Sequence, residues 1–155
     1  TAEARSLCKM ASDDEKLRQG LVQLRIYEGS ARALQSRLDI VNAAMNESAM
    51  ASTTLEGVQS QTPDAEALIP VGGGSFVRGK LADVSKIVMG VGAGVAIEKP
   101  IQDSISEIKG RVSDLEKART ALQEQLTQTL FRIEEERERL GEIVKKRGGD
   151  TLTVL

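Results

Sequence analysis

The chain has 155 residues, of which 28 % are charged and 2 % are aromatic, and its formal net charge is −2 at pH 7. Its aromatic residues, Tyr27, Phe76 and Phe131, are too few to fill a compact core of this size, which argues against an ordinary globular domain. The balanced charge gives no broad attraction to nucleic acid or to anionic membranes. No apolar run reaches the roughly 18 residues that a membrane span needs.

Composition also restricts the chemistry that the chain can perform. The absence of histidine removes the commonest general acid and base, and the commonest metal ligand. Cys8 is the single cysteine, so an internal disulfide and a multi-cysteine zinc site are excluded. We therefore expect no enzyme activity, no cofactor and no metal. The first residues lack the apolar run of a secretory signal, so we expect a cytoplasmic protein.

The first predicted element is a helical arm within residues 1–62. Its heptad a and d positions, which form one seam, are Leu17, Gly20, Leu24, Tyr27, Ala31, Leu34, Leu38, Val41, Met45, Ser48, Ser52, Leu55, Gln59 and Thr62. The small residues Ser48 and Ser52 weaken this seam. Ser12 precedes three acidic residues, which resembles a capping box and predicts a helix start near residue 12, whereas Leu7 and Met10 would allow residues 1–11 to add another turn. Pro63 ends the arm.

The centre, residues 63–99, contains four runs typical of β-strands, at 67–71, 76–81, 86–91 and 95–98. Short links that contain glycine join them in pairs, which predicts two hairpins. Several runs are apolar on both faces, and two isolated hairpins would leave open edges. We therefore predict an oligomerisation module that completes a sheet or barrel with other subunits. The residues assigned to it are Phe76, Val77, Leu81, Ile87, Val88, Met89, Val91, Val95 and Ile97.

The second helical arm is predicted over residues 100–147, followed by a flexible tail at 148–155. Its seam consists of Ile101, Ile105, Ile108, Val112, Leu115, Arg119, Leu122, Leu126, Thr129, Ile133, Glu136, Leu140 and Ile143. Arg119 and Glu136 interrupt the seam and are interpreted as register control. Pro100 suits a helix start, and Gly148 follows a basic last turn.

The matched lengths of the two arms favour an antiparallel coiled coil within the chain, although a parallel coiled coil between chains would satisfy the same heptads. The antiparallel arrangement gathers apolar residues at the free end: Leu7, Met10, Leu17, Leu21, Leu140, Ile143 and Val144. Leu21 lies off the seam, so the apolar surface is wider than two helices need. These residues either bind exposed apolar segments of other proteins or only close the coiled coil.

One motif suggests a nucleotide. Residues 74–80 have the G-x-x-x-x-G-K spacing of a phosphate loop, but Leu81 stands where serine or threonine would hold magnesium, and the context is a strand. An ATP-binding protein is therefore one hypothesis, and the sequence around the motif argues against it.

The centre resembles the alpha subunit of archaeal prefoldin in three segments: LIPV at 68–71, SFVRGKL at 75–81 and VGAGVAIEK at 91–99. This resemblance implies an ATP-independent molecular chaperone. Two alpha and four beta subunits would join their hairpins into β-barrels, and coiled-coil tips would capture unfolded polypeptides and pass them to a group II chaperonin. The presence of two hairpins matches the alpha class, because beta subunits carry one. The alternative is a structural or filament-forming coiled-coil protein that binds no client.

Overall fold

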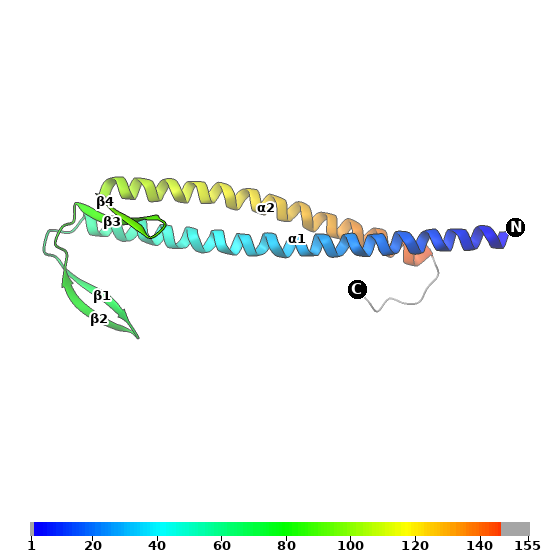
Figure 1. The fold of residues 1–155 in the computed structure, drawn as a ribbon, viewed down its shortest axis with the longest axis horizontal. Helices are drawn as coiled ribbons and strands as arrows, with labels where there is room; N and C mark the ends of the chain where they lie inside the picture. Colours follow the sequence, from blue (N-terminus) through cyan, green and yellow to red (C-terminus); the bar gives the residue numbers. More distant parts are fainter. Residues whose placement is uncertain (1, 147–155) are drawn as a thin grey trace. The chain divides into compact units, whose positions relative to one another are not determined.

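The computed structural model describes the backbone of residues 2–146 and the side chains of residues 11–146. Figure 1 shows two long helices with two β-hairpins between them in sequence. The elements are α1 (Ala2–Gln59), β1 (Glu66–Gly72), β2 (Ser75–Lys80), β3 (Lys86–Gly92), β4 (Val95–Pro100) and α2 (Ile101–Lys146). The predicted fold class, mainly α with two antiparallel β-hairpins and paired helices, is confirmed. Neither helix is apolar enough over a sufficient length, within the described residues, to cross a membrane.

The start of α1 contradicts the predicted cap at Ser12 and agrees with the alternative in which the residues before it add to the helix. The helix already runs at Ala2, so Ser12 lies inside it and does not cap it. Residues 2–10 are mostly alanine, glutamate, arginine, leucine, lysine and methionine, which favour helix, and they include no proline or glycine. These propensities extend the helix past the capping-box pattern. At the other end the helix stops at Gln59, four residues before Pro63.

The chain divides into two compact units, which we describe separately. The first contains the residues up to Ile40 and those from Arg119 onward. Its apolar cluster is formed by Leu24, Ile133 and Leu140, with Leu17, Tyr27 and Ala31 packed against them. The two helices run antiparallel here, because Gly20 lies beside Leu140 whereas Ala31 lines a groove with Leu130 and Ile133.

Close helix packing in this first unit depends on Gly20. A β-carbon at this position would lie 2.5 Å from Leu140 Cδ2 and 2.7 Å from Glu136 Oε1. The seam residue Glu136 also pairs with Arg139 one turn further on. An ion pair between helices, Arg137 Nη2 to Glu28 Oε1 at 2.9 Å, lies along the same unit. The glycine and the charged pair together favour one register of the two helices.

The second unit, Val41–Ala118, contains the other halves of the helices and both hairpins. Its buried residues include Ile101, Ser104, Ile105 and Ile108 at the start of α2, and Ser52 of α1. The helices are joined by Lys109 Nζ to Glu56 Oε1 at 2.6 Å and by Gln59 Nε2 to Gln102 Oε1 at 2.8 Å. In both units the predicted seam positions from Leu17 to Leu55 and from Ile101 to Ile143 are buried or half-buried, which confirms the heptad assignment over these stretches. The assignment is wrong at its end, because Gln59 is exposed and Thr62 lies beyond the last residue of α1.

Candidate assembly and client-binding surfaces

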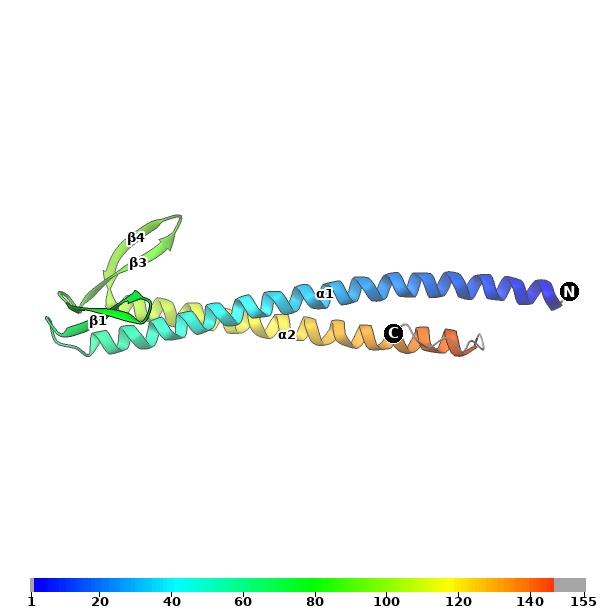
Figure 2. The same cartoon turned by 90° about the horizontal axis from the view of Figure 1, so that it is seen from below.

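The two hairpins are separate two-stranded antiparallel sheets, β1 with β2 and β3 with β4, as Figures 1 and 2 show. Their pairing registers are the same when one hairpin is shifted by 20 residues: Glu66 pairs with Lys80, and Lys86 pairs with Pro100. Each first strand also has a register irregularity just before its turn, at Val71 and at Val91. The hairpins are therefore two copies of one backbone design.

The turns explain why glycine is concentrated here. The first has φ of +98°, +58° and +74° at Gly72, Gly73 and Gly74, and the second has +102°, +51° and +74° at positions 92 to 94. Two-residue hairpin links of this kind need positive φ, which glycine adopts at little cost. Ala93 is the exception, because a β-carbon disfavours this region of backbone conformation.

The base of each hairpin closes on an equivalent backbone hydrogen bond. The Leu81 N–H donates to the Ala65 carbonyl at 3.0 Å, and the Ile101 N–H donates to the Ser85 carbonyl at 2.8 Å. Between the hairpins, Asp83 Oδ1 accepts hydrogen bonds from the Ser85 N–H at 2.7 Å and from its hydroxyl at 2.6 Å. These two bonds lower the pKa of the Asp83 carboxyl, so the linker turn is held by a charged acceptor.

One hairpin is seated on the helices of its own chain. Met89 of β3 is 8 % exposed, and with Ala51 and Ile108 it lines two shallow grooves of about 350 and 480 Å³. Lys99 Nζ of β4 contacts Glu107 Oε2 of α2 at 2.5 Å. This hydrogen bond is the main reason that the pKa of Glu107 lies below its usual value. Hence one face of the second hairpin is anchored by an apolar side chain and an ion pair.

Most of the large apolar side chains of the hairpins are exposed. Nine of the large hydrophobic side chains that are exposed in the described part of the chain belong to the hairpins: Leu68, Ile69, Val71, Phe76, Val77, Val88, Val91, Val95 and Ile97. Two-stranded sheets with both edges open and this much apolar surface are unstable alone in water. The arrangement is suited to burial against other polypeptide.

The structure places the predicted oligomerisation residues in two environments. Phe76, Val77, Val88, Val91, Val95 and Ile97 are exposed, whereas Ile87, Met89 and Leu81 are half-buried or buried. Met89 and Ile87 line the groove against α1 and α2, so their apolar surface is partly used within the chain. Leu81 lies one residue beyond β2 and closes the hairpin base. Leu68, Ile69 and Val71 are exposed residues that the sequence assignment omitted.

The predicted client-binding residues are also divided. Leu140 is 3 % exposed and belongs to the core of the first unit, with Leu17 packed against that core. Leu21 is exposed, and Ile143 and Val144 are half-buried. Leu7 and Met10, and the tail at 151–155, lie outside the residues whose side chains the structure describes. Exposed apolar residues that the assignment missed in this unit are Val22, Ile26, Ile40, Leu130 and Phe131.

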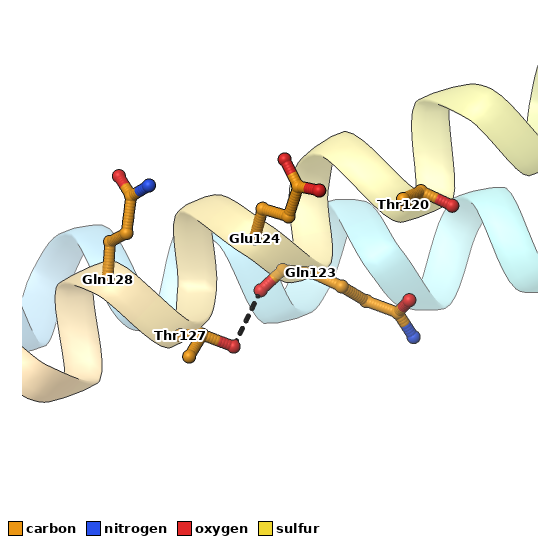
Figure 3. Close-up of a pocket in the computed structure, with 5 residues that line it drawn as sticks. All are labelled: Thr120, Gln123, Glu124, Thr127 and Gln128. Atoms are coloured by element: carbon orange, nitrogen blue, oxygen red, sulfur yellow. Dashed lines mark hydrogen bonds between the residues drawn. The ribbon is translucent and has the colours of Figure 1, made fainter.

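The phosphate-loop spacing at residues 74–80 falls in the first hairpin turn and along β2. No helix N-terminus follows it, so the backbone geometry that cradles a phosphate in that motif is not formed here. A polar hollow on α2 is lined by Thr120, Gln123, Glu124, Thr127 and Gln128 (Figure 3). Its residues come from successive turns of one helix, and Thr127 Oγ1 donates back to the Gln123 carbonyl at 2.9 Å. The hairpin explains the phosphate-loop spacing, and successive turns of α2 explain the hollow.

Comparison with known proteins agrees with this architecture. Residues 27–146 match the family model described as prefoldin subunit. The chain is 33 % identical over 105 residues to prefoldin subunit alpha 1 of Thermococcus kodakarensis, which covers 68 % of this chain and 72 % of the relative. It is 30 % identical over 136 residues to prefoldin subunit alpha of Methanococcus aeolicus, which covers 88 % and 92 % respectively.

A solved structure shares the fold. A chain of the filamentous PFD from Methanocaldococcus jannaschii, determined by cryo-EM, superposes with a TM-score of 0.63 at 20 % identity, over 72 % of this chain and 93 % of that one. The family match covers most of the residues that form the helices and all four strands. The chain therefore belongs to the prefoldin family of chaperone subunits, and the relatives that it resembles are alpha subunits.

Proposed function

We propose that this chain is a subunit of an ATP-independent cytoplasmic chaperone that captures unfolded polypeptides near the free ends of its helices and hands them to a group II chaperonin. In this proposal residues 1–62 and 100–147 act as arms, and residues 63–99 act as the oligomerisation module. The observation that carries it is the exposed apolar surface of the hairpins, because such a surface needs partners.

The partners that we propose are beta-type prefoldin subunits, in a hexamer of two alpha and four beta chains. Both hairpins offer open strand edges, and closure into an intersubunit β-barrel would satisfy those edges and bury the apolar side chains. Leu68 of β1, Phe76 of β2 and Val88 of β3 are the exposed residues whose burial would contribute most to this contact.

Client capture is assigned to the beginning of the first helical arm and to the end of the second. Leu21 is exposed there, and Ile143 and Val144 are half-buried, so they retain apolar surface beyond the helix seam. Several such ends in one particle would bind an unfolded chain at many weak contacts, which raises avidity without a deep pocket. No nucleotide is required for binding of this kind.

The test is suppression of aggregation of a chemically denatured client by the chain assembled with its beta partner. Deletion of residues 1–21 and 140–155 should abolish protection while leaving the particle intact. A milder variant, Leu21→Ser with Val144→Ser, should reduce protection, and Ile40→Ser is the matched control because Ile40 is exposed on the same unit. Equal protection by the deletion variant would contradict the assignment of the client site.

Transfer to the chaperonin has its own measurement. A client bound to the assembled particle should be refolded when a group II chaperonin and ATP are added, with a higher yield than when the client is diluted directly into the chaperonin. Equal yields would contradict the transfer step and leave client capture standing.

A structural, filament-forming role is the second candidate. It is favoured by the likeness to a chain from a filamentous assembly. Native mass spectrometry separates the two roles, because a closed hexamer with a partner supports the chaperone and open-ended oligomers of this chain alone support the filament.

A further inference from the structure

The outer face of α1 in the first unit carries an apolar strip that the coiled coil does not use. Val22 is 57 % exposed and Ile26 is 54 % exposed. Val22 and Ile26 are four residues apart, so they lie one above the other on the helix surface. Neither occupies a seam position, because the seam in this stretch runs through Gly20, Leu24 and Tyr27, which are buried or half-buried.

A row of arginines borders this strip. Arg18, Arg25 and Arg32 recur every seven residues, which keeps them on one side of the helix, and all three are exposed. Among the side chains at 11–146, none of the three takes part in an ion pair. The one acidic residue between Arg18 and Arg32 is Glu28, and Arg137 of α2 already binds its carboxylate at 2.9 Å. The strip is therefore apolar in its middle and positively charged along its edge.

The outer face of α2 in the same unit has the opposite sign. Phe131 is exposed there, and the exposed charged residues around it on that face are Glu134, Glu135 and Glu138. The two helices thus present apolar residues in contrasting electrostatic surroundings. This contrast supplies an internal control for any effect of charge on binding.

We infer that the strip formed by Val22 and Ile26, with Arg18, Arg25 and Arg32 along one edge, binds extended segments of non-native polypeptide in which an acidic residue recurs at every third position with aliphatic residues between. The inference rests on the proposed chaperone function and names the class of client that this surface prefers. Aliphatic side chains of the client cover Val22 and Ile26, while its carboxylates pair with the arginines, which are the side chains best suited to such pairs.

The spacing of the arginines sets the spacing of the acids. Seven residues of helix span about 10.5 Å at a rise of 1.5 Å per residue. A polyproline II chain has three residues per turn and advances about 3.1 Å per residue, so carboxylates at every third residue lie on one side of it and recur about every 9.3 Å, close to the spacing of the arginine row. Aliphatic residues between those acids then lie over Val22 and Ile26.

The experiment uses the chain assembled with its beta partner and two fluorescein-labelled peptides, one of four Glu-Leu-Thr repeats and one of four Lys-Leu-Thr repeats. Fluorescence anisotropy should show about tenfold tighter binding of the acidic peptide at low salt, and the preference should shrink as salt rises. Arg18→Glu with Arg25→Glu should remove the preference. Val22→Ser with Ile26→Ser should weaken binding of both peptides.

The matched control is Arg132→Glu with Lys145→Glu on α2, two exposed residues whose reversal changes the net charge by the same amount as the arginine reversal and should leave the preference for the acidic peptide in place. Equal affinity of the wild-type particle for the two peptides, or a preference that survives the arginine reversal, would overturn the inference while leaving client capture intact. Self-association of particles that the arginine reversal abolishes would also overturn it, because a second copy would then be the occupant. Failure to bind either peptide together with failure to suppress aggregation would remove the proposed function and this inference with it.

Discussion

The two hairpins have the same backbone and different surroundings. Both have the same register and equivalent closing hydrogen bonds, and three successive positive φ angles mark both turns. Yet Met89 of the second hairpin is 8 % exposed, whereas Ile69, which occupies the equivalent place in the first, is 52 % exposed. Local sequence sets the hairpin conformation, and side chains on one face determine what the hairpin contacts.

The residues at equivalent positions explain the difference. Ile87, Met89 and Lys99 reach α1 and α2 from one face of the second hairpin. Their counterparts in the first are Ala67, Ile69 and Gly79, two of which have short side chains or none. Gly79 also leaves space that Ile69 occupies, since a β-carbon there would lie 2.7 Å from Ile69 Cδ1. The first hairpin therefore keeps its apolar face available for another molecule.

The largest expected effect comes from truncating the anchor. Met89→Ala should lower the free energy of unfolding of the isolated chain by about 2–3 kcal/mol, because a buried methionine loses its contacts. The matched variant Ile69→Ala should cost less than about 1 kcal/mol in that state, since the side chain is half exposed. Urea unfolding at low protein concentration measures both. Equal losses would show that the two hairpins are not differently supported.

Substitutions in the two turns should change stability by an intermediate amount, with opposite signs in the two hairpins. Ala93→Gly should stabilise the second hairpin, and Gly73→Ala should destabilise the first, each by about 1 kcal/mol, because only glycine adopts these positive φ values without strain. Thermal unfolding of the two variants should therefore shift in opposite directions. Shifts of the same sign would contradict the equivalence of the turns.

The smallest effect concerns pH. Hydrogen bonding to Lys99 lowers the pKa of Glu107 below its ordinary value of 4.5, so the folded chain binds the proton less readily than the unfolded chain. The stabilisation is therefore present above pH 4.5 and is lost as pH falls through the lowered pKa. Urea midpoints at pH 7 and pH 3 should differ more in the wild type than in Glu107→Gln.

A second variant completes this test. Lys99→Gly gives the second hairpin the residue that the first has at position 79, and it should reduce the pH dependence as Glu107→Gln does. An unchanged difference between the two pH values in both variants would show that the ion pair does not seat the hairpin.

Sequence patterns predicted the helices and the hairpins because both depend on short-range spacing. The seam from Leu24 to Leu38 follows the heptads, and the glycines at 72–74 and 92–94 mark the turns. The heptad pattern could not reveal why the seam of α1 has small side chains at Ser48 and Ser52. In the structure, Ser48 lines the groove that Met89 enters from β3, a contact between residues far apart in sequence. Small residues there signal a third element and not a weak coiled coil.

The functional residues were harder to place because exposure depends on the partner helix. Leu140 was assigned to client binding because it is apolar and lies near the end of its arm. In the structure it is buried, because Gly20 beside it lets the two helices approach closely. Val22 and Ile26 lie outside the seam, and their off-heptad positions were the signal that could have identified them. Leu21 was found by that same reasoning.

The 20-residue offset makes the two hairpins equivalent units of backbone, although only the second carries the side chains that contact α1 and α2. Because both open and close on corresponding backbone bonds, removal or addition of one full copy leaves the flanking chain with the same entry and exit. A change of one whole hairpin would preserve this backbone path, whereas loss of the second copy would also remove the contacts of Met89 and Lys99 with the helices. A backbone built in this way can gain or lose a hairpin while the two helices keep their places at either end of it.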